Sequence, residues 1–226
     1  MALIYAHRGL HVSERENTIG AFREAVALGV DGVELDVRRS VDGHLIVHHD
    51  AIIDGVAISE VAYADLPDYV PTFEEALEAC RGIRVNVEIK NIRHASEPSY
   101  DESGDFARHV LDDLYRFEWA ASALISCFDL ATCEMIRSLD PSVGVGWLLG
   151  WSVELSGAMG RAKDSGFTGV HPYFQKVDEG AVARAREVNL DVNVWTVNDP
   201  GDIEAMQALG VDSIITDDPA TAMGQS

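Results

Sequence analysis

The chain has 226 residues, with 38 acidic side chains against 17 lysines and arginines, and its formal net charge is −21. A length of this order and 47% apolar residues fit one globular α/β domain and exclude wholesale disorder. The charge excludes unaided binding to nucleic acid or to an anionic membrane surface, because both need a cationic face, and it suits solubility at high ionic strength.

The cysteines and the first residues give no sign of a secreted, zinc-thiolate or membrane protein. Cys80, Cys127 and Cys133 are too scattered for a disulfide framework or a thiolate zinc site, and we expect them to be buried as small apolar residues. The first ten residues lack the pattern of a signal peptide, and no apolar run reaches the length of a membrane span. We therefore expect a cytoplasmic protein.

Short β-branched runs alternate with longer amphipathic stretches along the whole chain. The predicted strands are residues 3–6, 32–37, 84–90, 123–126, 143–148, 169–171, 191–197 and 213–216. The predicted helices are residues 18–28, 73–80, 106–115, 130–139, 153–165, 178–188 and 200–209, followed by a short segment at 219–223.

This alternation predicts parallel strands joined by right-handed crossovers. Eight such units in one domain, residues 1–226, predict a compact (β/α)8 TIM barrel, and a doubly wound open sheet is the competing arrangement. The rhythm breaks at residues 38–69, where the turn Asp42-Gly43 and a strand at 45–47 predict a short hairpin extension on the second βα loop. Residues 92–105 are polar and predict a mobile third βα loop.

Acidic residues gather where two of the predicted strands end. Glu34 and Asp36 are two residues apart on one strand and so point to the same face, and Glu88 is close to the end of the next strand. Because active sites of such barrels are built at the C-terminal ends of the strands, we expect the three carboxylates to meet there. One divalent cation that prefers oxygen ligands, Mg²⁺ or Ca²⁺ and also Mn²⁺, would neutralise them. The alternative is ion pairing with the nearby basic side chains of Arg8, Lys90 or Arg38.

Histidines also follow strand ends. His7 ends the first predicted strand, and of the neighbours His48 and His49 only one can face the site. Imidazole titrates near neutral pH (about 6.5), so one ring can activate a nucleophile while the other protonates a leaving alkoxide. With a metal and the cations Arg8 and Lys90 on the phosphate oxygens, this set predicts phosphoryl chemistry. The remaining loop and helix histidines, for which we expect surface positions, are His11, His44, His94 and His109.

The chain resembles the glycerophosphodiester phosphodiesterase family in a series of motifs that run in the family's order from residue 4 to residue 219. They are His7-Arg8-Gly9, Glu16-Asn17-Thr18, Gly32-Val-Glu-Leu-Asp36-Val, His49-Asp50, Asn86-Val-Glu88-Ile-Lys90, Ser126-Cys-Phe128, Val194-Trp195-Thr196-Val197-Asn198 and Gly210-Val-Asp212-Ser-Ile-Ile-Thr216-Asp217-Asp-Pro219.

The resemblance implies a TIM barrel that hydrolyses glycerophosphodiesters, small-molecule substrates, to an alcohol and sn-glycerol 3-phosphate. It implies that His7 and His49 are the acid/base pair. The implied metal ligands are Glu34, Asp36 and Glu88, and the implied substrate contacts are Arg8 and Lys90 at the phosphate and Trp195 as a wall of the glycerol pocket.

Residues 51–59 depart from the family pattern, because they are apolar and short where the family continues with a polar stretch. We therefore expect a more open rim around the alcohol group, to which His171-Pro172 contributes either a contact or structural support. Two other functions remain open: a related phospholipase or lyase acting on phosphatidylinositol or sphingomyelin, and a non-catalytic barrel that binds phosphorylated ligands. Stable membrane association is not expected of so acidic a chain.

Overall fold

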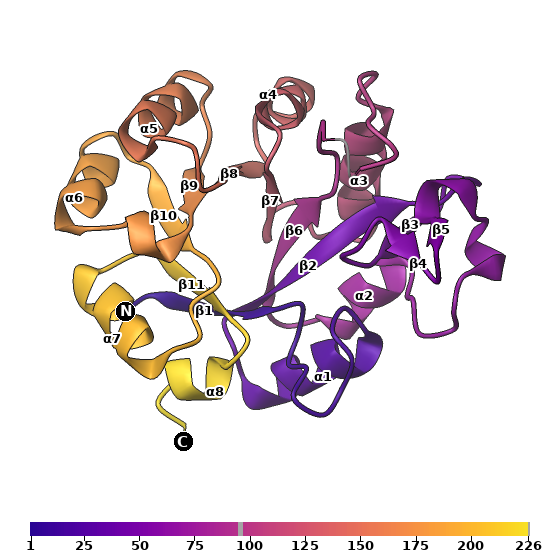
Figure 1. Cartoon of the computed structure of the whole chain (residues 1–226), viewed down its shortest axis with the longest axis horizontal. Coiled ribbons are helices and arrows are strands. Elements are labelled where there is room, and N and C mark those ends of the chain that lie inside the picture. The colour runs from indigo at the N-terminus through magenta and orange to yellow at the C-terminus, as the bar shows by residue number, and fades with distance from the viewer. Residues whose placement is uncertain (95–96, 226) are drawn as a thin grey trace.

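The computed structural model describes residues 1–94 and 97–225. Within these residues, eight parallel strands form a closed ring in the order β1-β11-β10-β9-β8-β7-β6-β2, with β2 paired back to β1 (Figure 1). Their bounds are β1 Leu3–His7, β2 Gly32–Arg39, β6 Arg84–Ile89, β7 Ala123–Cys127, β8 Gly144–Leu149, β9 Gly169–Pro172, β10 Asp191–Val194 and β11 Ser213–Thr216. The predicted (β/α)8 barrel is confirmed, and the open sheet is wrong.

Closure of the barrel brings the two ends of the chain together. Strand β1 pairs with β11 on one side, where Ala6 lies opposite Thr216, and with β2 on the other, where His7 lies opposite Glu34. Strand β2 pairs in turn with β6, with Asp36 opposite Glu88. The register therefore places the ends of four neighbouring strands side by side.

The helices pack around the barrel (Figure 1). Their bounds are α1 Ile19–Leu28, α2 Phe73–Ala79, α3 Asp105–Arg116, α4 Leu130–Leu139, α5 Leu155–Asp164, α6 Glu179–Glu187, α7 Pro200–Leu209 and α8 Pro219–Ala222. Local sequence explains where several of them start and stop. Thr72 and Glu75 form a reciprocal capping box at the start of α2, and Gly29 ends α1 in the left-handed conformation that glycine adopts without strain.

The second βα loop carries the predicted hairpin extension. Strand β3, Leu45–Val47, runs antiparallel to β2, with Val47 opposite Val37. Beyond it lies a second hairpin that the sequence pattern did not predict, formed by β4, Ile52–Ile53, and β5, Val56–Ala57 (Figure 1). Its turn is Asp54-Gly55 with both φ angles positive, the typical turn between two short β-branched runs.

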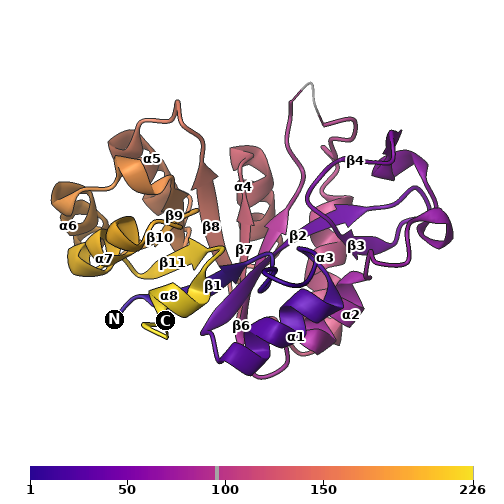
Figure 2. The same ribbon diagram turned by 60° about the horizontal axis from the view of Figure 1, so that its bottom comes forward.

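Three further features complete the fold. The cysteines are buried and unpaired, as predicted. Both termini lie beside α7 and α8 in the two views (Figures 1 and 2). Among the described residues, the longest apolar helices fall short of what a bilayer crossing requires.

A buried polar cluster fills part of the barrel interior. His171 on β9 is fully buried, and its Nε2 accepts a hydrogen bond of 3.0 Å from the Asn193 amide, whose oxygen accepts one of 2.6 Å from the Ser213 hydroxyl. Gly146 leaves room for the ring, because a Cβ there would lie 2.1 Å from His171 Nε2. His171 is therefore a structural core residue rather than a contact at the rim.

We predict that His171 makes the fold sensitive to acid. Burial lowers the pKa of His171 from 6.5 to about 3, so between these values the unfolded chain binds a proton that the folded chain does not. Stability attributable to this group is complete above pH 6.5 and is lost as the pH falls toward 3. Between pH 6.5 and pH 5 the wild type should lose about 2 kcal/mol more than the His171→Gln variant.

Urea unfolding at several pH values measures this difference. If the unfolding free energy changed with pH by the same slope in the two proteins, His171 would not be the cause of the acid sensitivity.

Candidate active site

Three carboxylates meet at the mouth of the barrel. Glu34 and Asp36 project from β2 and Glu88 from β6, and one oxygen of each lies within 4.8 Å of the others. All three residues are buried, with 3%, 1% and 8% of their surface exposed. The i, i+2 spacing on β2 and the pairing of Asp36 with Glu88 produce this cluster.

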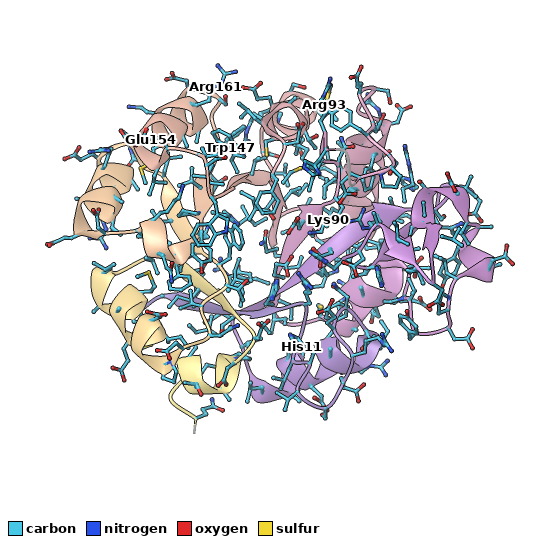
Figure 3. The ribbon with its side chains drawn as sticks, viewed as in Figure 1. His11, Lys90, Arg93, Trp147, Glu154 and Arg161 are labelled. Carbon is cyan, nitrogen blue, oxygen red and sulfur yellow. The ribbon has the colours of Figure 1, made fainter. Side chains whose placement is uncertain are left out.

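Two cations compensate part of this charge. Lys90 Nζ lies 2.9 Å from Asp36 Oδ1 and 2.5 Å from Glu88 Oε1, and Arg8 Nε lies 3.3 Å from Asp36 Oδ2. Lys90 lies beside β2 and β6 near the centre of the molecule (Figure 3). The predicted alternative of ion pairing is therefore realised for Asp36 and Glu88. Arg38 does not join these pairs.

The carboxylates differ in their electrostatic environment. Burial alone would raise the pKa of Asp36, but the charges of Lys90 and Arg8 outweigh it and lower that pKa below its usual value. The pKa of Glu34 is raised well above its usual value, first by burial and then by the negative charges of Asp36 and Glu88. Glu34 is thus the acid that lacks sufficient compensation.

This unequal compensation fits a cation site. Among the described residues, no protein group donates a hydrogen bond to the buried Oε1 atom of Glu34, and the other carboxylates are close to it. Three carboxylates face two cations, Lys90 and Arg8. An oxygen-rich, negatively charged cluster of this kind is compatible with Mg²⁺, Ca²⁺ or Mn²⁺.

His7 stands at the end of β1 with both ring nitrogens directed at acids. Its Nδ1 lies 2.7 Å from Asp217 Oδ1, and its Nε2 lies 3.9 Å from Glu34 Oε2. Because an ionised carboxylate only accepts hydrogen bonds, Nδ1 carries a proton, and in the neutral form of the ring the lone pair is then on Nε2. Burial alone would raise the pKa of Asp217, but hydrogen bonds from His7 and Asn198 hold it below its usual value.

His49 has the same arrangement. Its Nδ1 donates a hydrogen bond of 2.8 Å to Asp50 Oδ1, so the carboxylate is bound at Nδ1 and not at Nε2. Burial and then the positive charge of Lys90 lower the pKa of His49 and favour the neutral ring. Of the two neighbouring histidines, His48 instead turns its Nδ1 to the backbone oxygen of Asp50.

Both imidazoles line one pocket of about 150 Å³. Seven of the eight predicted site residues line it: His7, Arg8, Glu34, His49, Glu88, Lys90 and Trp195. The eighth, Asp36, lies behind Lys90 and Arg8 as their ion-pair partner. The opposite wall is apolar, with Trp195 packed edge-on against Phe128 at 5.4 Å between ring centroids. Trp195 is oriented by a hydrogen bond of 2.6 Å from its Nε1 to the His171 carbonyl.

The loop after β1 is built around Arg8 and Asn17. Both have positive φ angles, of 55° and 56°. Arg8 donates to both oxygens of Glu16, and the Asn17 amide donates a hydrogen bond of 2.7 Å to Asp36. Thr18, not Asn17, therefore caps α1, because the Asn17 side chain supports the acidic cluster instead.

Two residues near the site were missed as functional candidates. Asp217 holds His7, and it also lies 3.1 Å from His11 Nε2, which places His11 at the site rather than on an unrelated surface. A sequence signal existed for Asp217, because it follows the last predicted strand, which neighbours the first strand in a closed barrel.

Comparison with known proteins agrees with this geometry. Residues 7–221 match the sequence profile of the glycerophosphoryl diester phosphodiesterase family. The chain belongs to this family. A glycerophosphodiester phosphodiesterase of Caldanaerobacter subterraneus subsp. tengcongensis is 28% identical over 240 residues, which cover 97% of this chain and 95% of that protein.

Solved structures of other proteins have the same fold. A glycerophosphodiester phosphodiesterase of Parabacteroides distasonis superposes with a TM-score of 0.87 at 28% identity, covering 99% of this chain and 95% of that one. An Oleispira antarctica phosphodiesterase, solved in complex with the product sn-glycerol-3-phosphate, superposes with a TM-score of 0.87 at 21% identity, covering 100% and 96%. The predicted family and the predicted enzyme class, a phosphodiesterase, are thereby confirmed.

We predict that Lys90 stabilises the acidic cluster of this family member. In the Lys90→Gln variant, Asp36 and Glu88 lose a buried counter-charge, so without metal the free energy of unfolding should fall by about 3 kcal/mol. Because a cation that binds the cluster stabilises the folded state, added Mg²⁺ should recover part of the loss.

The matched control is Lys163→Gln, at an exposed position on α5, where a change within about 0.5 kcal/mol is expected. Urea unfolding in EDTA and in Mg²⁺ measures both. Equal losses in the two variants would contradict the role of Lys90.

Proposed function

We propose that residues 1–226 form one catalytic domain that hydrolyses glycerophosphodiesters to an alcohol and sn-glycerol 3-phosphate. The observation that carries the proposal is the pocket in which two imidazoles, each held at Nδ1 by a carboxylate, stand next to three buried acids. The named relatives support the substrate class. A cytoplasmic location without stable membrane association stays a prediction.

The pocket suits a small phosphodiester on both of its sides. On the polar side, Arg8 and Lys90 are placed to donate to phosphate oxygens, because the described ion pairs use only some of their N–H groups. On the apolar side, Trp195 and Phe128 can cover the carbon face of the glycerol. The pocket volume of about 150 Å³ leaves the alcohol group to extend past the rim.

We assign the proton transfers to His7 and His49. One imidazole enters the step neutral and takes a proton at Nε2 from the attacking water, or from the glycerol hydroxyl of the substrate. The other enters as an imidazolium and gives its Nε2 proton to the leaving alkoxide oxygen. Asp217 and Asp50 fix the tautomers that leave Nε2 available and stabilise the imidazolium that each ring becomes in turn.

Glu34, Asp36 and Glu88 would hold the divalent cation in this proposal. When bound, such an ion supplies a positive charge that stabilises negative phosphate oxygens. A barrel that only binds phosphorylated ligands would have no need for two histidines supported in the same way.

Turnover of a substrate panel tests the proposal. With glycerophosphocholine, glycerophosphoethanolamine and glycerophosphoinositol, we expect release of glycerol 3-phosphate that EDTA abolishes and Mg²⁺, Ca²⁺ or Mn²⁺ restores. Phosphorus NMR of the same reactions shows whether water or the substrate hydroxyl attacks, because only the second route forms a cyclic phosphate. Activity that ignores the chelator would overturn the metal assignment, and binding without turnover would favour the non-catalytic barrel.

We predict that Asp217→Asn impairs catalysis without unfolding the protein. An Asn amide can donate to Nδ1 and so favour the wrong tautomer of His7, which should lower kcat by about 100-fold or more. The matched control is Asp218→Asn, because Asp218 caps α8 and Asn caps helices equally well. Kinetics and thermal melts of both variants separate the two effects. A kcat for Asp217→Asn close to that of the wild type would remove Asp217 from the mechanism.

A further inference from the structure

Arg38 extends the row of functional side chains on β2. It follows Glu34 and Asp36 at the same two-residue spacing, and it is 5% exposed. Its guanidinium does not reach the acidic cluster. Instead, Nε and Nη2 donate hydrogen bonds of 2.9 and 2.6 Å to the backbone carbonyl of His49.

The other side of the same guanidinium faces the third βα loop. Nη1 lies 2.8 Å from Glu97 Oε2 and Nη2 lies 3.1 Å from Glu97 Oε1, a two-pronged ion pair across 59 positions of sequence. The two side chains are 6% and 13% exposed. A pair this buried is weakly screened, and removal of one partner leaves the other charge without compensation.

A second ion pair of the same loop provides a contrast. Arg93 lies 2.7 Å from Glu102, but their side chains are 64% and 70% exposed and neither residue lines the pocket that holds the two imidazoles. Exposed pairs of this kind contribute little to structure. Among its described residues, the loop therefore has one surface pair and one buried pair, and the buried pair is the one that reaches a histidine of the pocket.

We propose that Arg38 and Glu97 are positioning residues for His49, an inference that rests on the proposed function. Two N–H groups fix the His49 carbonyl, and Glu97 holds the guanidinium in the plane that this contact needs. The peptide of His49 is thereby anchored while its Nδ1 is held by Asp50, so the direction of Nε2 is set from both ends.

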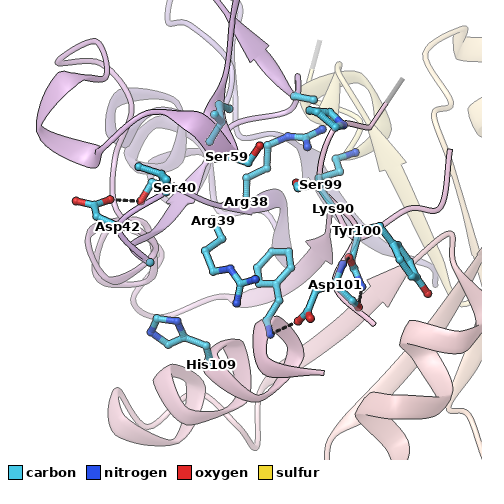
Figure 4. Close-up of a pocket in the computed structure, with 17 residues that line it drawn as sticks. Arg38, Arg39, Ser40, Asp42, Ser59, Lys90, Ser99, Tyr100, Asp101 and His109 are labelled. Carbon is cyan, nitrogen blue, oxygen red and sulfur yellow. Dashed lines mark hydrogen bonds between the residues drawn. The ribbon is translucent and has the colours of Figure 1, made fainter. Parts of the chain in front are cut away.

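The third βα loop thus takes part in organising the site. A cavity of about 780 Å³ lies between this loop and the β2–β3 hairpin, and Arg38 and Lys90 both line it (Figure 4). Figure 4 shows both side chains beside the segment with Ser99 and Tyr100. Arg38, which lines this cavity, contacts both the His49 carbonyl and Glu97 of the loop, so the position of the loop and the position of the histidine depend on each other.

The test is the Glu97→Gln variant, which keeps the size of the side chain and removes its charge. We expect kcat on glycerophosphocholine with Mg²⁺ to fall about tenfold while KM stays within about twofold, because a displaced acid/base group affects the transition state more than binding. Arg38→Lys should give a similar loss, because one ammonium cannot hold both the carbonyl and the carboxylate. Glu97→Asp, which keeps the charge, should retain more activity than Glu97→Gln.

Glu102→Gln is the matched control, in the same loop and with the same chemical change, and it should leave kcat unchanged. A second control is the His49→Ala background, where Glu97→Gln should lower the residual kcat less than about twofold, because residues that act through one group are not additive. The imidazole ¹⁵N NMR signals of the full chain give a readout independent of turnover. Glu97→Gln should shift the signals of His49 and leave those of His171 unchanged.

Several results would overturn the inference. They are a wild-type kcat in Glu97→Gln, the same fold loss in the His49→Ala background, and an unmoved His49 signal. A failure of the proposed function looks different, because the wild type would then release no glycerol 3-phosphate. A failure of the proton-transfer assignment would leave His49→Ala with near-wild-type turnover.

Discussion

The mouth of the barrel is organised by the need to compensate three buried carboxylates. Glu34, Asp36 and Glu88 cannot all be charged and dry without nearby positive charge. Lys90 lies between two of them, and Arg8 reaches Asp36 from a loop whose backbone is bent through positive φ angles. The first loop, the end of β6 and the raised pKa of Glu34 are all consequences of gathering these acids in one place.

Strand pattern and position made most of this site predictable. Two-residue spacing dictated that Glu34 and Asp36 share a face, and alternation of strands and helices dictated a parallel sheet whose carboxyl ends meet. Once the sheet closes, His7 must lie beside Glu34, because β1 and β2 are neighbours. Family motifs added the choice of His49 over His48, which the geometry of adjacent residues left open.

Contacts between loops could not be predicted from the sequence. They depend on the path of the chain in space, whereas strands and helices are recognised by a periodic pattern of residues. The Arg38–Glu97 pair joins a strand end to a loop of irregular structure 59 positions away in the sequence. The β4–β5 hairpin was missed for another reason. Its Asp54-Gly55 turn is a clear hairpin signal, but each of its strands has only two residues, which is too short to show an alternating pattern. Trp195 lies just after β10 rather than within it, because the chain turns away toward α7 after a single bridge to Tyr173.

The net charge of −21 matters most at the mouth of the barrel, because an anionic substrate must bind there. An anionic phosphodiester approaching this surface meets Arg8 and Lys90, but both already face carboxylates, so the protein alone offers it little positive potential. In the proposed site, the charges of three carboxylates and two cationic side chains add up to a negative value. A bound divalent cation makes this local net charge positive. Substrate binding and metal binding are then coupled by electrostatics, because the same carboxylates that attract the metal repel the substrate when the metal is absent.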